Sequence, residues 1–244
     1  MEHSGGQGIR VATWNVEWAA RPHRDAITAR LASVDADVLV VTEGVTSVLP
    51  TGGNHALGDA NWGIPLSDPQ RRKVLLWSRF PLSDVVTDPG TGMPPGRFVA
   101  ATCHTPAGPI RVIGVCIPWS FAHVTSGRGD AEPWQEHLQF LHGLRPLIEQ
   151  HPPSLPLIVM GDFNQRIPRM RAPRHVSDAL EELLRPLHVV TSGDITGLPS
   201  GTIDHIAVTP RLHASEVYGI SRRDADGAQL SDHDLIAAEL VVRP

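Results

Sequence analysis

The stretch that most constrains the fold is residues 157–164, which read LIVMGDFN. Its four apolar residues, 157–160, follow a segment rich in proline, and a short run of this kind predicts a strand buried on both faces. Gly161 is expected to let the backbone turn at the end of the strand. Asp162 and Asn164 then follow a rigid element, where open sheets present functional groups. Alone, the motif fits equally well a strand closed by an Asx turn.

The composition predicts one folded domain. Of the 244 residues, 41% are hydrophobic and 19% are charged, which is enough apolar material for a substantial core and argues against wholesale disorder. The 22 prolines and 22 glycines indicate many turns and few long helices. We expect a flexible N-terminal tail over residues 1–9 and a single domain over residues 10–244.

Charge and cysteine content exclude several classes of protein. A net charge of −5 argues against a protein wrapped in nucleic acid, although a local basic cleft stays possible. Cys103 and Cys116 are the only cysteines, so neither a disulfide scaffold nor a Cys-rich zinc site is expected, and two buried reduced thiols are favoured. Residues 1–10 have no apolar signal core and no run is long enough to span a bilayer, which predicts a soluble, cytoplasmic protein. We assume a monomer.

Apolar runs predict many strands separated by a few helices. The expected strands are residues 9–14, 37–42, 73–77, 82–86, 97–104, 110–117, 157–160, 202–208, 214–220 and 235–242. The expected helices are residues 25–33, 132–149 and 177–184. Pro146 predicts a kink or an early end in the second helix, and Ser177 is expected to cap the third. Hairpins in the middle make the sheets mixed, and two sheets packed face to face with helices outside accommodate this many strands.

Polar residues recur where these apolar runs end. They are Asn15, Glu17, Glu43, Asp162, Asn164, Asp204, Asp232 and His233. A packed interior does not accept such groups unless they are paired or bind something. Several carboxylates at one edge of a sheet repel one another, and a divalent cation relieves the repulsion. Oxygen ligands of this kind favour Mg²⁺ or Mn²⁺ over Zn²⁺.

Asp204 and His233 are candidates for an ion pair. The segment 202–208, TIDHIAV, places Asp204 on one face of a strand, and an acid inside an apolar strand usually has a partner. A carboxylate that fixes the orientation of His233 favours its charged form, which can bind a phosphate oxygen. The alternatives are an Asp204 bonded only to backbone and a solvated turn around His233.

Five motifs in order, TWNVEW, VVTEG, GDFN, TIDHI and SDH, resemble the endonuclease/exonuclease/phosphatase superfamily. The resemblance runs from about residue 10 to the C-terminus. It implies an α+β fold, a four-layer αββα sandwich of two mixed sheets flanked by helices, as in DNase I. It also implies a Mg²⁺- or Mn²⁺-dependent hydrolase in which water attacks a phosphoester in line.

The resemblance also implies roles for the residues at strand ends. Glu43 is implied as the principal metal ligand, with Asn15 and Glu17 at the same site and Asp232 near it. Asn15 is also implied in catalysis.

Four further residues are implied in the reaction itself. Asp162 is expected to orient or deprotonate the attacking water, and Asn164 to hydrogen-bond the phosphoryl group or the nucleophile. Asp204 is expected to pair with His233, which contacts the scissile phosphate.

One segment departs from the family pattern. Residues 115–120 read VCIPWS, where the family usually offers a Tyr or His near the phosphate, often with an Asn. His123 or Arg128 are candidates for the missing donor, and Trp119 for stacking on a base or sugar or for simple packing.

The substrate is less constrained than the chemistry. Residues 165–174 carry four arginines directly after the GDFN motif, and residues 71–73 form a second basic cluster. Basic groups beside such a site favour a nucleic-acid backbone, although a solvated basic loop has the same appearance. We favour a nuclease-like phosphodiesterase. The alternatives are a phosphomonoesterase, a lipid-type phosphodiesterase and a weakly active binding module on the same fold.

Overall fold

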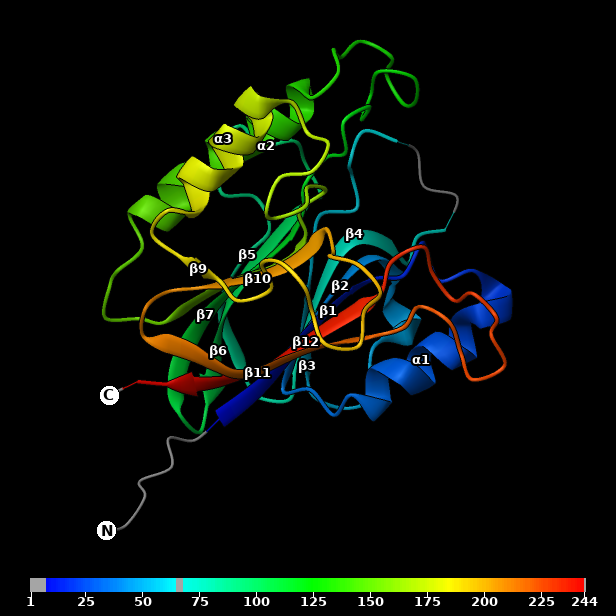
Figure 1. Ribbon diagram of the computed structural model, residues 1–244, viewed down its shortest axis with the longest axis vertical. Helices are drawn as coiled ribbons and strands as arrows, with labels where there is room; N and C mark the ends of the chain where they lie inside the picture. Colours follow the sequence, from blue (N-terminus) through cyan, green and yellow to red (C-terminus); the bar gives the residue numbers. More distant parts are fainter. Residues whose placement is uncertain (1–7, 65–67, 244) are drawn as a thin grey trace.

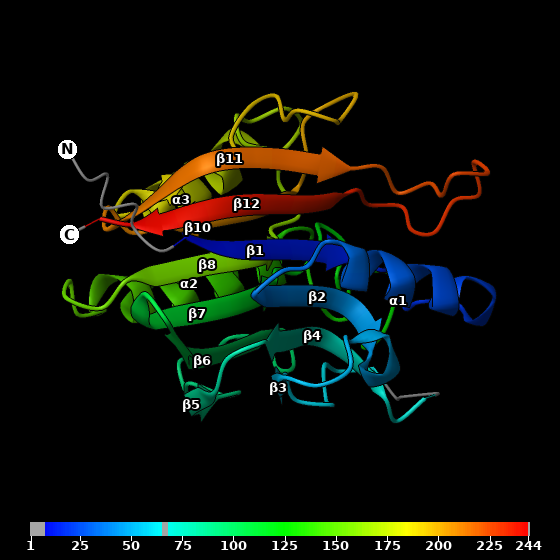
Figure 2. The ribbon, with the colours of Figure 1, turned by 90° about the horizontal axis from the view of Figure 1, so that it is seen from below.

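Two six-stranded sheets stack face to face in the computed structural model, which describes residues 8–64 and 68–243 (Figures 1 and 2). One helix covers the outer face of the first sheet, and two helices lie side by side on the outer face of the second (Figure 1). The predicted four-layer αββα arrangement is therefore confirmed.

The first sheet contains one parallel pair among antiparallel neighbours. Its order is β11 (Leu212–Ile220), β12 (Leu235–Val242), β1 (Gly8–Asn15), β2 (Val38–Val45), β4 (Arg71–Ser78) and β3 (Asn54–Leu57). Strands β1 and β2 are parallel, and the helix α1 (Arg24–Ser33) connects them through the short 3-10 turn η1 (Arg21–His23). A second 3-10 turn, η2 (Thr46–Val48), follows β2.

The second sheet is built in the same way. Its order is β5 (Leu82–Val86), β6 (Phe98–Thr105), β7 (Gly108–Cys116), β8 (Leu157–Asp162), β10 (Asp204–Val208) and β9 (His188–Val189). Strands β7 and β8 are parallel and joined through α2 (Gln135–Glu149), whereas α3 (Arg174–Leu184) follows β8.

Alternation along the strands divides the core into layers. In β1, Ile9 and Val11 point between the sheets, whereas Ala12 and Trp14 point toward α1. Between the sheets, β7 approaches the first sheet so closely that a Cβ on Gly114 would lie 3.0 Å from Val74 and 3.1 Å from Val40. The inner layer is therefore thin as well as apolar at this point.

Several local predictions need correction. The strand β1 begins at Gly8, so residues 8 and 9 belong to it, and the rest of the predicted tail lies outside the described residues. Strand β3 is not among the expected strands. The helix α2 continues past Pro146 to Glu149 because its apolar face stays buried on the sheet, so the early end is wrong.

The third helix begins earlier than predicted. It starts at Arg174, where the amides of Val176 and Ser177 donate to the Pro173 carbonyl at 3.0 and 3.1 Å. Ser177 therefore lies inside the first turn and does not cap it. Its hydroxyl donates to Glu181 one turn later, at 3.2 Å.

Gly161 has a different function from the predicted turn. The strand β8 continues through it to Asp162. Its φ is 141°, and a Cβ at this position would lie 1.9 Å from the carbonyl oxygen of Val115 on β7. Only glycine allows the two parallel strands to approach in this way just before Asp162.

A buried polar network supports the loop that follows β8. His137 on α2 donates from Nδ1 to the Pro118 carbonyl at 2.8 Å and accepts at Nε2 from the Gln165 amide at 2.7 Å. His205 donates from Nε2 to the Gln165 carbonyl at 3.0 Å and accepts at Nδ1 from Thr191. Each imidazole therefore has one donor and one acceptor, the pattern of a neutral ring. Burial lowers the pKa of His137 and of His205 to about 4.

Replacing Gly161 by alanine is expected to destabilise the protein by about 3 kcal/mol or more, because the methyl group collides with backbone and the φ is unfavourable. Urea unfolding measures the change. Gly193→Ala is the control, since Gly193 also has a positive φ of 84° but open space around its Cα. It should cost about 1 to 2 kcal/mol, from φ alone. Equal losses in both variants would show that the contact with Val115 is unimportant.

Stability should fall as the pH drops from about 6.5 to about 4, since the unfolded chain then binds protons that the neutral histidines of the fold exclude. At 1.36 kcal/mol per pKa unit, His137 accounts for roughly 2 kcal/mol of the loss between pH 7 and 5. His137→Gln should therefore show a flatter decline than the wild type in urea unfolding at both pH values. The exposed His213→Gln is the matched control. A decline as steep in His137→Gln as in the wild type would contradict the assignment.

Candidate active site

Strand ends from both sheets meet at one edge of the sandwich. The register pairs Asp204, at the start of β10, with Asp162, at the end of β8. In the other sheet β12 runs antiparallel to β1, so the residues just before β12 lie beside the end of β1. Two bonds fix them there: the Ser231 hydroxyl donates to the Asn15 carbonyl at 2.6 Å, and the Trp14 indole donates to the His233 carbonyl at 2.8 Å.

Asp162 is buried and held by three donors. The side-chain amides of Asn15 and Asn164 donate to its Oδ2 at 3.0 and 3.1 Å, and the backbone amide of Asn164 donates to its Oδ1 at 2.9 Å. Asn164 adopts a left-handed φ of 53°, and its side chain also donates to the Ile117 carbonyl at 2.8 Å. The GDFN motif therefore forms the predicted Asx-type turn and brings Asp162 to the site as well.

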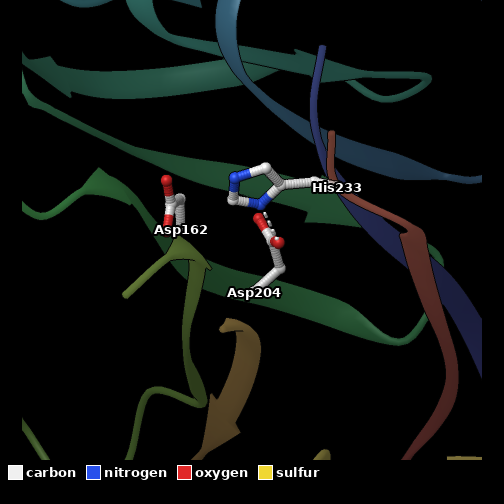
Figure 3. Close-up of side chains that lie close together, drawn as sticks. All are labelled: Asp162, Asp204 and His233. Carbon is white, nitrogen blue, oxygen red and sulfur yellow. Dashed lines mark hydrogen bonds and ion pairs between the residues drawn. The ribbon is translucent and has the colours of Figure 1, made fainter. Parts of the chain in front are cut away.

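The predicted pair of Asp204 and His233 is present. Nδ1 of His233 lies 2.6 Å from Oδ2 of Asp204, and the imidazole projects between the two aspartates (Figure 3). Ligand atoms of Asp162, Asp204 and His233 lie within 4.8 Å of one another. The other oxygen of Asp204, Oδ1, is buried and has no hydrogen-bond partner among the described residues.

The electrostatics of this cluster follow from burial and from the close acids. Although burial lowers the pKa of His233, Asp204 and then Asp162 outweigh it and raise that pKa to about 10. Burial, together with the charge of Asp204, raises the pKa of Asp162 to about 7. Near neutral pH the imidazole is therefore protonated, and Asp162 is poised to take up or release a proton.

Glu43 comes from β2, the strand parallel to β1. It has a left-handed φ of 48°, its side chain is 23% exposed, and its charge acts on Asp162. Its Oε1 lies 2.5 Å from Nζ of Lys73 on the neighbouring strand β4. Glu43 thus lies at the same edge of the sandwich, and the ammonium of Lys73 already pairs with its carboxylate.

The remaining two predicted acids are more exposed. The Asn15 side chain accepts from the Glu17 amide at 3.0 Å, but the Glu17 side chain makes no hydrogen bond or ion pair within residues 8–64 and 68–243. Asp232 is 58% exposed in its side chain, and its Oδ1 lies 3.8 Å from Nε2 of His233. The structure therefore places Asp232 beside the imidazole of His233. Glu17 contacts Asn15 through its backbone amide and not through its side chain.

The two candidates for the phosphate-binding donor that residues 115–120 lack lie away from the Asp162, Asp204 and His233 cluster. His123 is buried with its Nε2 3.3 Å from the Trp62 carbonyl, and Arg128 pairs with Glu136 at 2.6 Å. Trp119 is 46% exposed and packs against Phe121. Within the part of the chain that the structure describes, neither His123 nor Arg128 contacts Asp162, Asp204 or His233. The Glu136 carboxylate on α2 holds the loop that carries His123 and Arg128.

Sequence reasoning missed two groups of supporting residues. Lys73 belongs to the basic cluster at residues 71–73, but the antiparallel register of β2 and β4 places it directly across from Glu43. His137 and His205 were not singled out, and their pairing through Gln165 crosses three segments with no shared sequence signal.

Known structures share this fold. An apurinic (AP) endonuclease from Archaeoglobus fulgidus has a TM-score of 0.67 and 17% identity, covering 94% of this chain and 98% of that one. A 3'-5' exonuclease from Neisseria meningitidis has a TM-score of 0.70 and 18% identity, with coverages of 96% and 100%. The endonuclease domain of the retrotransposon TRAS1 has a TM-score of 0.65 and 16% identity, with coverages of 98% and 100%. At these identities the likeness establishes the fold.

Family membership comes from the sequence. No curated protein sequence matches the chain. The model of the endonuclease/exonuclease/phosphatase family, by contrast, matches residues 12–233, which span the site from Asn15 to His233. This chain therefore belongs to the endonuclease/exonuclease/phosphatase family.

Proposed function

We propose that the chain is a divalent-metal-dependent phosphodiester hydrolase of the nuclease type. The observation that carries the proposal is the meeting of Asp162 with His233, which Asp204 holds through Nδ1, at the edge shared by both sheets, with ligand atoms of the three residues within 4.8 Å of one another. One group suits the removal of a proton from water, and the other suits the negative charge of a phosphate. Family membership supports hydrolysis of a phosphate ester.

The residues at this edge fit a hard divalent cation. The side chains available beside Glu43 are carboxylates and the Asn15 amide, whose oxygens are the ligands that hard cations take. We assign Glu43 as the principal ligand, with Asn15 beside it and with Glu17 and Asp232 near the site. Mg²⁺ or Mn²⁺ bound there would polarise a phosphoryl oxygen and offset the developing charge.

His233 is a weaker candidate for a ligand than Glu43. Its Nδ1 is occupied by Asp204, and the raised pKa keeps the imidazole protonated near neutral pH, whereas a metal needs a neutral ring. We therefore assign the Asp162, Asp204 and His233 cluster to proton transfer and phosphate binding, and place the cation on the Glu43 and Asn15 side.

In the proposed reaction Asp162 accepts a proton as the oxygen of water forms its bond to phosphorus. The bond from phosphorus to the leaving oxygen breaks on the opposite side. Asn164 donates its side-chain amide to the Ile117 carbonyl and to Asp162, so its fixed amide oxygen can accept a hydrogen bond from the attacking water and orient it. Asn15 holds the carboxylate of Asp162 from the other sheet.

His233 is proposed to contact the scissile phosphate through Nε2. Asp204 is only 1% exposed and fixes the ring through Nδ1, so the second nitrogen faces the site. Since the imidazolium is formed before substrate binds, its charge costs little reorganisation in the transition state.

Two adjoining cavities favour a substrate larger than a simple phosphate monoester. One, of about 170 Å³, is lined by His233 and Asp204 together with Arg166 and Arg222. The next, of about 270 Å³, shares Arg166 and is lined by Trp134, Met170 and Arg171. Arginine beside the phosphate site and an apolar pocket beyond it suit a nucleic-acid strand, in which charged and apolar parts alternate.

The remaining predictions concern membrane spans, location in the cell, oligomeric state and domain bounds. No helix among the described residues is long and apolar enough to cross a membrane. A cytoplasmic location, a monomeric state and the assignment of residues 10–244 to one domain remain predictions.

We expect the purified chain to nick plasmid or cut abasic duplex DNA with Mg²⁺ or Mn²⁺, and EDTA to abolish the activity, because the acids at the site need a cation to bind phosphate. Gel assays of DNA and colorimetric assays of bis-p-nitrophenyl phosphate and inositol phosphates measure this. Turnover of monoesters alone would replace the nuclease by a phosphatase. Absence of turnover on every substrate would favour a binding module.

His233→Ala and Asp162→Asn are each expected to lower kcat by on the order of 10² or more, from loss of a charge stabiliser or of a base. Steady-state kinetics on the best substrate of the panel measure the loss. His213→Ala and Asp178→Asn, exposed positions on β11 and α3, are the matched controls and should keep wild-type rates. Near-normal kcat in either site variant would remove the role assigned to that residue.

A further inference from the structure

Lys73 is unusual in this chain. Of its 21 Lys and Arg residues, Lys73 is the only lysine. It is also buried, with 7% of the residue exposed, on the strand β4 in the first sheet. A buried lysine is costly unless its ammonium has a partner.

The partner is the carboxylate assigned above to the metal. Nζ of Lys73 lies 2.5 Å from Oε1 of Glu43 and 4.7 Å from the ring centre of Trp18. The side chains of Lys73 and Glu43 are 9% and 23% exposed, so the pair is poorly hydrated. The ammonium therefore neutralises Glu43 and is also stabilised by the indole face.

A lysine suits this position better than the arginines used elsewhere in the chain. Its ammonium is a compact point charge on a flexible stem and can shift between partners by rotation, whereas a guanidinium is a planar fork. Trp18 provides the second partner, and its own position is fixed by stacking on Trp62 with ring centres 5.2 Å apart. A cation at this position can therefore leave the carboxylate without leaving the protein.

We propose that Lys73 is the resident counter-ion of Glu43 and that a divalent metal binds by displacing its ammonium from the carboxylate. This rests on the proposed function, since Glu43 must be a metal ligand. A metal ion and an ammonium at the same oxygen repel each other strongly in a poorly hydrated site. Entry of the metal therefore moves Nζ away from Oε1, and Lys73 lowers the affinity for the metal while holding Glu43 in place before it arrives.

The single lysine provides a direct test. In the 244-residue chain grown with ¹³Cε- and ¹⁵Nζ-labelled lysine, the only side-chain lysine signals come from Lys73. Titration with Mg²⁺ should shift these signals with the same Kd for Mg²⁺ that is obtained from its competition with Mn²⁺ for the site. Metal bound at the site with no change in the Lys73 signals would overturn the proposal.

Variants provide the second test. The affinity for Mn²⁺, measured without substrate by the electron paramagnetic resonance signal of free Mn²⁺, should rise at least 10-fold in Lys73→Met. Arg72→Met is the matched control: it removes one positive charge from the same strand, and Arg72 bonds the Pro69 and Arg71 carbonyls instead of Glu43. Its affinity should stay within threefold of the wild type.

The outcomes separate this proposal from the proposed function. Unchanged or weaker binding of Mn²⁺ in Lys73→Met, with normal binding in the wild type, overturns only the role of Lys73. No binding of Mn²⁺ in either protein overturns both. If Lys73→Met does not fold, the titration of the labelled wild-type protein still decides the question.

Discussion

Two hydrogen-bonded contacts between the sheets hold the site together. Asn15, at the end of β1 in the first sheet, donates to Asp162, at the end of β8 in the second. His233, in the loop before β12 in the first sheet, pairs with Asp204, at the start of β10 in the second. Neither sheet contains all four residues, so the proposed chemistry depends on the two sheets packing in one register.

The backbone near these contacts is strained. Glu17, Trp18 and Ala19 have left-handed φ values of 45°, 65° and 46°, and Glu43 and Asn164 have values of 48° and 53°. None of them is glycine, and each such residue costs roughly 1 to 3 kcal/mol unless the surroundings compensate. The compensation here includes the bond from the Trp18 amide to the Glu43 carbonyl and the stacking of Trp18 on Trp62. Strain of this kind accompanies positions where side chains must point to one place.

Much of this arrangement could be predicted from the sequence, because the signals were local. The apolar run before Asp162 predicted a buried strand, and the position of Asp204 inside an apolar strand predicted a charged partner. Both expectations were confirmed, as were the two buried free cysteines.

What could not be predicted depends on contacts between distant segments. In the sequence Lys73 is one member of a basic cluster, and only the register of β2 and β4 places it opposite Glu43. His137, Gln165 and His205 carry no common pattern, since they join a helix, a loop and a strand. Pro146 and Ser177 were misjudged because the packing of α2 and the Pro173 carbonyl outweigh local preference.

The close approach at Gly114 links the interior to the chemistry. There, Val40 and Val74 of the first sheet occupy the space that a side chain on β7 would need, so the absence of a Cβ sets how near the two layers can come. Asn15 and Asp162 bridge that same gap only two strand positions further along. The distance between the two sheets therefore also sets how Asn15 and Asp162 are aligned. Added volume between the sheets at this point would separate Asn15 from Asp162 while leaving each sheet intact.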